Sequence, residues 1–334
     1  MSLRKELTKG YEISSILNGM WQVSGAHGYI DKERAIKSME KHVEKGFVTF
    51  DLADHYGPAE DFVREFREKQ IQDGNENLLK DVSFFTKWVP PPIKITKSIV
   101  EEAVNISKNR MGMETLDMIQ FHWWEYQNKN YLKALEYLNE LKDSGLIKLL
   151  GITNFDTNHL QEFLEMGFPI TSNQVQYSLI DRRPEKLMEE VCRKNDVKLL
   201  AYGTLAGGLL SKRYLNVSEP RSNDLNTASL QKYKRMIDRW GDWNLFQKLL
   251  NTLNFIAEKH DVSVANVAVK YVLDNPVVAG AIIGVRFGIS DHIEENLNVL
   301  NFELDDQDLT EITSILDESR DLMKIIGDCG DEYR

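Results

Sequence analysis

The sequence predicts an α/β fold and, within that class, a closed (β/α)8 barrel, the TIM barrel. Short apolar runs alternate with amphipathic runs through most of the 334 residues, a pattern typical of parallel strands joined by crossover helices. Polar residues stand where several apolar runs end, and a barrel gathers such ends on one face. A doubly wound sheet is the alternative, but no GxGxxG turn follows the first strand, and the glycine-rich run Leu205–Leu209 comes after a late strand.

Periodicity assigns the individual elements. Continuous apolar runs indicate strands buried on both faces, whereas apolar residues recurring every three to four positions indicate helices. After an opening stretch over Ile13–Gln22, strands are predicted over Phe47–Ala53, Val82–Lys87, Asp117–His122, Ile147–Ile152, Ile170–Gln176, Val197–Tyr202 and Val277–Ile283, and helices over Lys32–Lys45, Glu60–Asp73, Thr96–Met111, Tyr131–Ser144, Thr157–Met166 and Glu185–Lys194. Gly145 then supplies a common C-terminal stop for the helix before it.

A long insertion is predicted after the seventh strand, with a helical tail at the C-terminus. Residues Ser211–Asn244 break the alternation and contain two tryptophans and two tyrosines. We expect this insertion to lie over the carboxyl face of the barrel as a lid, with Trp240 or Trp243 closing the substrate or cofactor site. The competing interpretation is that these tryptophans pack on the outer helices as a satellite core. No linker interrupts the chain, so residues 1–334 are predicted to form one domain.

Composition narrows the class of protein. The formal net charge of -11 argues against nucleic acid and anionic membranes as partners, which leaves a small molecule as the expected one. Cys192 and Cys329 lie far apart and are expected to be unpaired thiols of a reducing compartment. The first residues lack the apolar core of a signal peptide, and no apolar run reaches membrane-spanning length. We therefore expect a cytoplasmic protein, and its oligomeric state stays open.

Four polar residues near predicted strand ends suggest proton-transfer chemistry. Asp51, Lys87 and His122 end three of the strands, and Tyr56 follows in the loop after the first. A lysine beside a tyrosine favours the phenolate and should lower the pKa of the phenol, a carboxylate can fix the lysine, and a histidine can bind the oxygen that is protonated. Each residue alone is more simply explained by structure, but the four together predict chemistry on a carbonyl or an alcohol.

Six segments, in order along the chain, resemble signatures of the aldo-keto reductase family. They are Gly19–Trp21, Phe50–Glu60, Thr86–Trp88, Asp117–Trp123, Gly151–Phe155 and Asn173–Tyr177. The family's catalytic Asp and Tyr are five positions apart, as Asp51 and Tyr56 are. The resemblance implies a (β/α)8 barrel that reduces aldehydes or ketones with NAD(P)H and carries no metal. It also implies that Tyr56 is the general acid, assisted by Lys87, Asp51 and His122.

The resemblance implies further binding residues. The cofactor set is Gly19, Met20, Trp21, Thr153, Asn154, Gln174, Tyr202, Gly203, Leu205, Gly284, Arg286, Glu295 and Asn296. The substrate pocket set is Trp21, Tyr56, Trp88, His122, Trp123, Trp240 and Trp243. For Trp21 a plug at the bottom of the barrel is a competing role.

The expected cofactor is NADP(H), with NAD(H) possible. Arg286 falls where family members place a basic residue on the 2′-phosphate, but His292 falls where many place an Arg. The sequence also departs from the family's Tyr-Ser-Pro-Leu after the seventh strand, with Gly203 and Thr204 in the middle positions. A cofactor-binding regulatory subunit on the same fold is the alternative function, and the intact set of four polar residues favours the enzyme.

Overall fold

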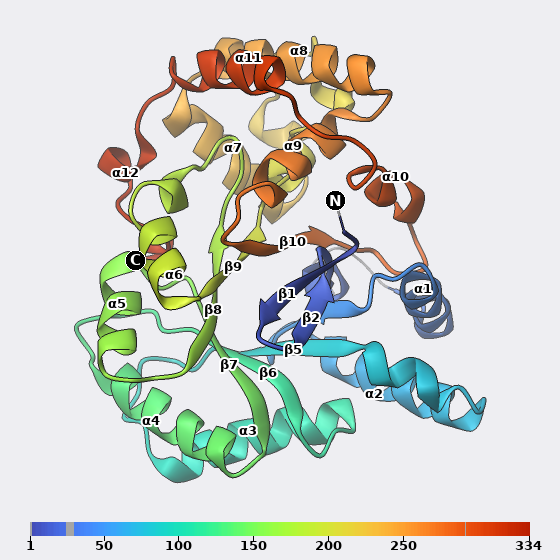
Figure 1. Ribbon diagram of the computed structural model, residues 1–334, viewed down its shortest axis with the longest axis vertical. Helices are drawn as coiled ribbons and strands as arrows, with labels where there is room; N and C mark the ends of the chain where they lie inside the picture. The colour runs from blue at the N-terminus through green and yellow to red at the C-terminus, as the bar shows by residue number, and fades with distance from the viewer. Residues whose placement is uncertain (1, 25–29, 291) are drawn as a thin grey trace.

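Eight parallel strands close into a barrel in the computed structural model of the chain, which describes residues 2–24, 30–290 and 292–334 (Figure 1). The strands are β3 (Ile16–Gly19), β4 (Thr49–Asp51), β5 (Ser83–Trp88), β6 (Leu116–Phe121), β7 (Ile147–Thr153), β8 (Ile170–Gln176), β9 (Lys198–Tyr202) and β10 (Val278–Gly284). They pair in sequence order, and β10 closes the ring on β3. The predicted (β/α)8 barrel is therefore confirmed.

An antiparallel hairpin that periodicity did not reveal covers the amino-terminal end of the barrel. It consists of β1 (Arg4–Thr8) and β2 (Tyr11–Ser14) and lies near the centre of the view in Figure 1. The Tyr11 hydroxyl lies 2.9 Å from that of Ser83, the first residue of β5. Leu7 and Ile13 are fully buried against apolar side chains of the barrel interior. The hairpin thus seals this end and leaves the carboxyl ends, which we call the mouth, for the site.

Helices surround the barrel and bury its outer face. They are α1 (Lys32–Glu44), α2 (Ala59–Gln72), α3 (Lys97–Met111), α4 (Asn130–Asp143), α5 (Thr157–Glu165), α6 (Met188–Asn195), α9 (Val264–Leu273) and α10 (Ile293–Asn298). Several of these helices begin at a side-chain N-cap. The Asp31 carboxylate accepts the N–H of Arg34 at the start of α1, and the Asp156 carboxylate accepts the N–H of His159 at the start of α5. Helix α6 begins three residues later than predicted, because a 3-10 turn containing Pro184 precedes it.

The insertion after β9 builds a second core beside the barrel. It contains α7 (Ala228–Trp240) and the start of α8 (Trp243–His260), and α8 lies beside α11 (Asp306–Leu316) at the top of Figure 1. Trp240 is 1% exposed and Trp243 is 6% exposed, and both pack in this second core. The prediction that one of them closes the site is therefore wrong. Their large apolar surfaces are buried between helices, as the satellite-core interpretation held.

The predicted C-terminal tail folds back to the mouth. After α12 (Leu322–Ile325) the chain runs to a 3-10 turn at Asp331–Tyr333. The Arg334 guanidinium donates to the carbonyl oxygens of Trp123 at 3.0 Å and Asn154 at 2.8 Å. The tail therefore contacts residues directly after β6 and β7. Among the residues that the structure describes, no helix combines the length and apolarity that a membrane span requires.

We expect packing between α2 and the barrel to contribute strongly to stability. Phe66 is fully buried on α2, and its ring lies 6.3 Å from those of Phe50 on β4 and Phe84 on β5. Phe66→Ala should lower the free energy of unfolding by about 3–5 kcal/mol, because it leaves a cavity at this contact. Urea denaturation measures the change. Ile71→Ala on the same helix is the control, since Ile71 is 48% exposed; equal losses in the two variants would contradict the packing described.

Candidate active site

Neighbouring strands bring the four predicted polar residues to the mouth. Asp51 is the last residue of β4, Lys87 lies near the end of β5, and His122 directly follows β6. Tyr56 lies in the turn between β4 and α2, where its N–H donates to the Ala53 carbonyl at 3.1 Å. Because β4, β5 and β6 are adjacent and parallel, their carboxyl ends lie side by side.

A buried ion pair forms the centre of this group. The Lys87 Nζ lies 2.6 Å from Asp51 Oδ2 and 3.0 Å from the Leu52 carbonyl oxygen, and both charged residues are buried. Burial lowers the pKa of Lys87, and the Asp51 carboxylate opposes that change. The other carboxylate oxygen, Oδ1, accepts from Gln120 Nε2 at 2.9 Å and Gln174 Nε2 at 2.7 Å. Three donors from three strands thus hold the carboxylate in one orientation.

The Tyr56 ring lies against this ion pair. Lys87 Nζ is 5.0 Å from the centroid of the ring, and Trp21 contacts the same ring edge-on at 5.0 Å. Burial raises the pKa of the Tyr56 phenol well above its ordinary value, and the negative charge of Asp51 acts in the same direction. The sequence predicts that Lys87 lowers this pKa. The expectation is wrong in direction, because burial and the Asp51 carboxylate outweigh the effect of the ammonium. The phenol is therefore protonated, as a proton donor must be.

His122 presents a neutral ring with an open hydrogen-bonding position. Burial lowers the pKa of His122 to about 3, and the nearby positive charge of Arg334 contributes. Its Nε2 atom is buried and has no hydrogen-bond partner among the residues that the structure describes. Because buried polar atoms are normally paired, an orphaned ring nitrogen beside the ion pair is a position for a ligand oxygen.

Four residues predicted to bind the cofactor also meet at the mouth. The Thr153 hydroxyl and the Asn154 N–H both donate to the Gln174 carbonyl, at 3.1 and 2.9 Å. Asn154 has a left-handed backbone with φ of 58°, and its Oδ1 accepts from the Tyr202 hydroxyl at 2.8 Å. Among the described residues, no hydrogen bond engages the Asn154 amide nitrogen or the Gln174 Oε1, which leaves one donor and one acceptor. This pair is complementary to a primary carboxamide.

Other predicted cofactor residues line the seam between β3 and β10 and the segments after β9 and β10. Gly19 pairs with Gly284 across the seam, and Met20 is buried beside them. The backbone of Gly203 has a φ of 74°, and a Cβ at this position would lie 2.3 Å from the Tyr233 hydroxyl of α7. Only glycine therefore fits under this helix. Leu205 follows in the same turn.

After β10, Arg286 forms an isolated bridge with Ser290. The carboxylate of Glu295, next to Asn296 in α10, lies 3.1 Å from His292 Nδ1. His292 is thus the partner of a residue expected to contact adenine.

The structure separates the predicted substrate-pocket tryptophans. Trp21 is 38% exposed and touches Tyr56, which fits a wall of the mouth. Trp88 packs on Phe121 in the main core. Trp123 is fully buried in the same core, and its indole N–H donates to two backbone carbonyl oxygens. The placement of Trp123 in the pocket is therefore corrected. Its neighbour Trp124 is 40% exposed and meets the His122 ring edge-on at 4.3 Å.

The tail and α7 supply residues that sequence patterns missed. The Tyr333 hydroxyl lies 3.1 Å from that of Tyr202 and accepts from the Lys232 ammonium of α7. Lys232 also lies over the rings of Tyr202, Tyr233 and Tyr333. The insertion therefore does lie over the mouth, through α7 residues other than its tryptophan. No local signal could have revealed Tyr333, because 131 positions separate it from Tyr202.

Comparison with known proteins identifies a family. The model of the aldo/keto reductase family matches residues 15–317. An uncharacterized oxidoreductase of Bacillus subtilis is 25% identical over 313 residues, covering 90% of this chain and 92% of its own. The L-glyceraldehyde 3-phosphate reductase of Escherichia coli K12 is 25% identical over 304 residues, covering 87% of this chain and 85% of its own.

Solved structures share the fold. The glycerol dehydrogenase of Gluconobacter oxydans superposes with a TM-score of 0.75 at 23% identity, covering 92% of this chain and 93% of its own. An aldo/keto reductase of Klebsiella pneumoniae, solved with NADP and acetate, gives a TM-score of 0.70 at 18% identity, covering 95% and 96%.

The depressed pKa of His122 predicts a pH dependence of stability. The unfolded chain binds a proton at His122 below about pH 6.5 whereas the folded protein does so only near pH 3, so stability falls as the pH drops through this window. Between pH 7.5 and pH 5 this histidine should account for a loss of about 2 kcal/mol. His122→Asn should remove that part of the loss, measured by urea denaturation at both pH values. His292→Asn is the control, because His292 is exposed. If the free energy of unfolding of His122→Asn falls between pH 7.5 and pH 5 as much as that of the wild type, His122 does not have a depressed pKa.

Proposed function

Because the chain belongs to the aldo/keto reductase family, we propose that it reduces a small aldehyde or ketone to an alcohol, or catalyses the reverse, with Tyr56 as the proton donor. The observation that carries this proposal is the open Nε2 of a neutral His122 at the mouth, beside the buried Lys87–Asp51 pair. A neutral imidazole donates one hydrogen bond without offering its own proton for transfer. It can therefore hold a carbonyl oxygen in place for protonation by another group.

Tyr56 is the group we assign to protonation. Its phenol is held in the protonated form by burial and by the Asp51 charge. The alkoxide formed by hydride addition is a stronger base than a phenolate, so the proton moves from Tyr56 to the substrate oxygen. The Lys87 ammonium, 5.0 Å from the centroid of the ring, stabilises the phenolate that remains. Asp51 is a positioning residue, because it acts through Lys87.

The carboxamide-complementary pair at Asn154 and Gln174 fits a nicotinamide. A nicotinamide cofactor, when bound, supplies the hydride. The Asn154 amide nitrogen would donate to the carboxamide oxygen and Gln174 Oε1 would accept from its amide nitrogen, with Thr153 supporting Gln174. Tyr202, which bonds to Asn154 at 2.8 Å, would present its ring to the nicotinamide. Gly19, Gly203 and Gly284 would offer backbone groups to the rest of the cofactor.

We further propose that NADPH is preferred to NADH. Arg286 follows β10 and offers a planar fork that can bind a 2′-phosphate through two hydrogen bonds. Glu295 and Asn296 would contact the adenosine. The Klebsiella pneumoniae neighbour was solved with NADP, whereas a methylglyoxal reductase of Escherichia coli, 23% identical, is described as NADH-specific.

Tyr56→Phe should abolish most turnover while cofactor binding survives. The ring and its contacts with Trp21 and Lys87 remain, and only the transferable proton is lost. We expect kcat to fall by a factor of about 10²–10⁴. Turnover is measured as the loss of absorbance at 340 nm when NADPH is mixed with each of a panel of small aldehydes. The Kd for NADPH should stay within about twofold of the wild-type value. Tyr137→Phe, on the outer helix α4, is the matched control. Wild-type turnover in Tyr56→Phe would remove Tyr56 from the mechanism.

Arg286→Ala tests the cofactor preference. The KM for NADPH should rise about tenfold or more, since a charge-assisted contact with the phosphate is lost, and the KM for NADH should stay nearly unchanged. Steady-state kinetics with each cofactor and the same aldehyde give both values. If both constants rise equally, Arg286 contacts a part that the two cofactors share.

A further inference from the structure

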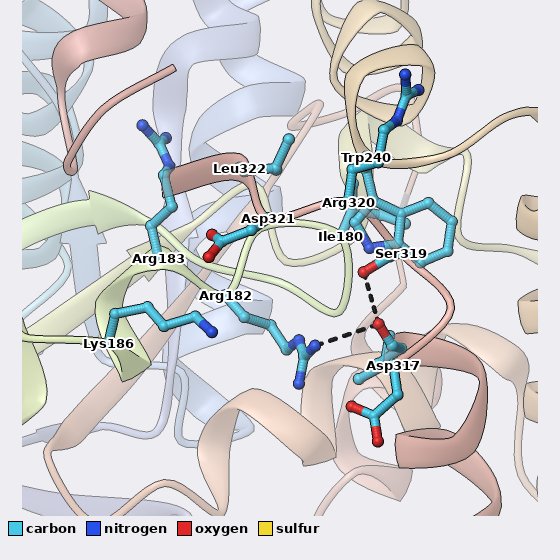
Figure 2. Close-up of a pocket in the computed structure, with 11 residues that line it drawn as sticks. Ile180, Arg182, Arg183, Lys186, Trp240, Asp317, Ser319, Arg320, Asp321 and Leu322 are labelled. Atoms are coloured by element: carbon cyan, nitrogen blue, oxygen red, sulfur yellow. Dashed lines mark hydrogen bonds between the residues drawn. The ribbon is translucent and has the colours of Figure 1, made fainter. Parts of the chain in front are cut away.

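A cavity outside the mouth has the features of a second binding site. It measures about 210 Å³ and lies between the segment after β8, the end of α7 and the linker from α11 to α12 (Figure 2). Its lining includes Arg182, Lys186, Trp240, Ser319 and Asp321. None of these residues takes part in the chemistry proposed above.

A buried donor in this cavity has no partner. Trp240 is 1% exposed, and its Nε1 has no hydrogen-bond partner within the part of the chain that the structure describes. Figure 2 shows the nitrogen edge of the indole on the side of the cavity where the Ser319 hydroxyl lies. That hydroxyl donates to the Leu316 carbonyl at 2.6 Å, and within the described residues no hydrogen bond joins it to the indole. A buried N–H of this kind normally has an acceptor, and a ligand oxygen in the cavity would supply one.

Two cations can reach the same space. The side chain of Lys186 has no hydrogen bond or ion pair with any residue that the structure describes, and Figure 2 shows its ammonium directed into the cavity. The Arg182 guanidinium donates to the Leu316 carbonyl at 3.4 Å, lies 3.9 Å from a Glu185 carboxylate oxygen and also contacts the Tyr271 hydroxyl, which leaves several of its five N–H groups without an acceptor among the described residues. Both groups therefore keep donors for a ligand.

Most other charges of the lining have partners, although the Asp317 carboxylate has no hydrogen bond or ion pair with a residue that the structure describes. The Arg183 guanidinium is bound to Asp181 and Glu332, and that of Arg320 donates to the carbonyl oxygens of Asp238 and Gly241. One oxygen of Asp321 accepts the N–H of Met323, capping α12. In a protein with a formal charge of -11, the lining of this cavity still carries four cationic side chains, Arg182, Arg183, Lys186 and Arg320, against the two carboxylates Asp317 and Asp321.

We propose that this cavity binds a small dianionic oxyanion of the phosphate type. Lys186 and Arg182 would supply the charge, and the Trp240 indole N–H would supply a directed hydrogen bond. The volume admits a phosphate group with a few further atoms, and Ile180 and Leu322 offer apolar contacts to the remainder.

Occupancy of the cavity would act on the tail that reaches the mouth. Asp321 and Leu322 line the cavity and start α12, whose continuation carries Glu332. Arg183 also lines it, and donates to the Asp328 carbonyl at 2.7 Å and to the Glu332 carboxylate at 2.9 Å. A ligand here therefore contacts both attachments of the tail, and we infer that it holds residues 322–334 more firmly.

Calorimetric titration of inorganic phosphate into the NADPH-saturated protein, in chloride buffer at pH 7.5, tests the proposal. Excess cofactor fills any phosphate site within the cofactor cleft. Lys186→Gln and Arg182→Gln should each weaken phosphate binding about tenfold, and Trp240→Phe, which removes the N–H but keeps an aromatic ring, should weaken it about threefold. Lys194→Gln is the control, because Lys194 is exposed and pairs with Glu190 at 2.6 Å. Acetate should bind more weakly than phosphate.

Hydrogen exchange provides the second measurement. Phosphate should slow amide exchange in residues 322–334 of the wild type, and should leave exchange unchanged in Lys186→Gln. The proposal is overturned if phosphate does not bind, if the Gln variants bind it as the control does, or if acetate binds equally well. Binding without any change of exchange in the tail would overturn the coupling to the mouth.

Discussion

The ion pair between Lys87 and Asp51 is the interaction on which the rest of the site depends. An isolated ammonium or carboxylate inside the barrel would be very costly, so each side chain requires the other at close range. Their 2.6 Å contact is possible because β4 and β5 are adjacent and Asp51, level with Phe85, lies only two residues before Lys87 along the strand pair. A buried ion pair adds little net stability compared with apolar side chains that could fill the same space. Its place beneath Tyr56 is therefore better explained by chemistry than by folding.

The same pair organises its neighbours. Because Asp51 also accepts from Gln120 and Gln174, it links β4 to β6 and β8 across the barrel. Gln174 in turn faces the position assigned to the carboxamide of the cofactor, so one carboxylate orients groups on both sides of the reaction. The pair is nearly neutral as a unit. Burial is the main cause that raises the pKa of Tyr56, with Asp51 acting in the same direction, and burial together with the positive charges of Arg334 and Lys87 lowers the pKa of His122.

Much of the fold and the core of the site could be predicted from sequence, because local patterns carry them. Continuous apolar runs mark the buried strands, and Asp51, Lys87 and His122 are read directly at their ends. The tryptophans could not be placed, because a pair such as Trp123 and Trp124 gives no sign of which ring turns into the core. The aromatic content of the insertion is typical of a lid, so the sequence suggests that Trp240 and Trp243 face the site. The packing of α7 on α8 and α11 instead buries both side chains. The tail residues Tyr333 and Arg334 reach the mouth through contacts that no local pattern encodes.

A double-mutant cycle on Asp51→Asn and Lys87→Met tests the central claim most directly. The claim is that the two residues act as one unit that poises Tyr56. We therefore expect each single variant to lose most of kcat/KM for a small aldehyde, and the double variant to be no worse than the poorer single variant. Circular dichroism and urea denaturation would establish that the variants compared are folded. Losses that simply multiply in the double variant would show that Asp51 and Lys87 act independently, and would contradict the account.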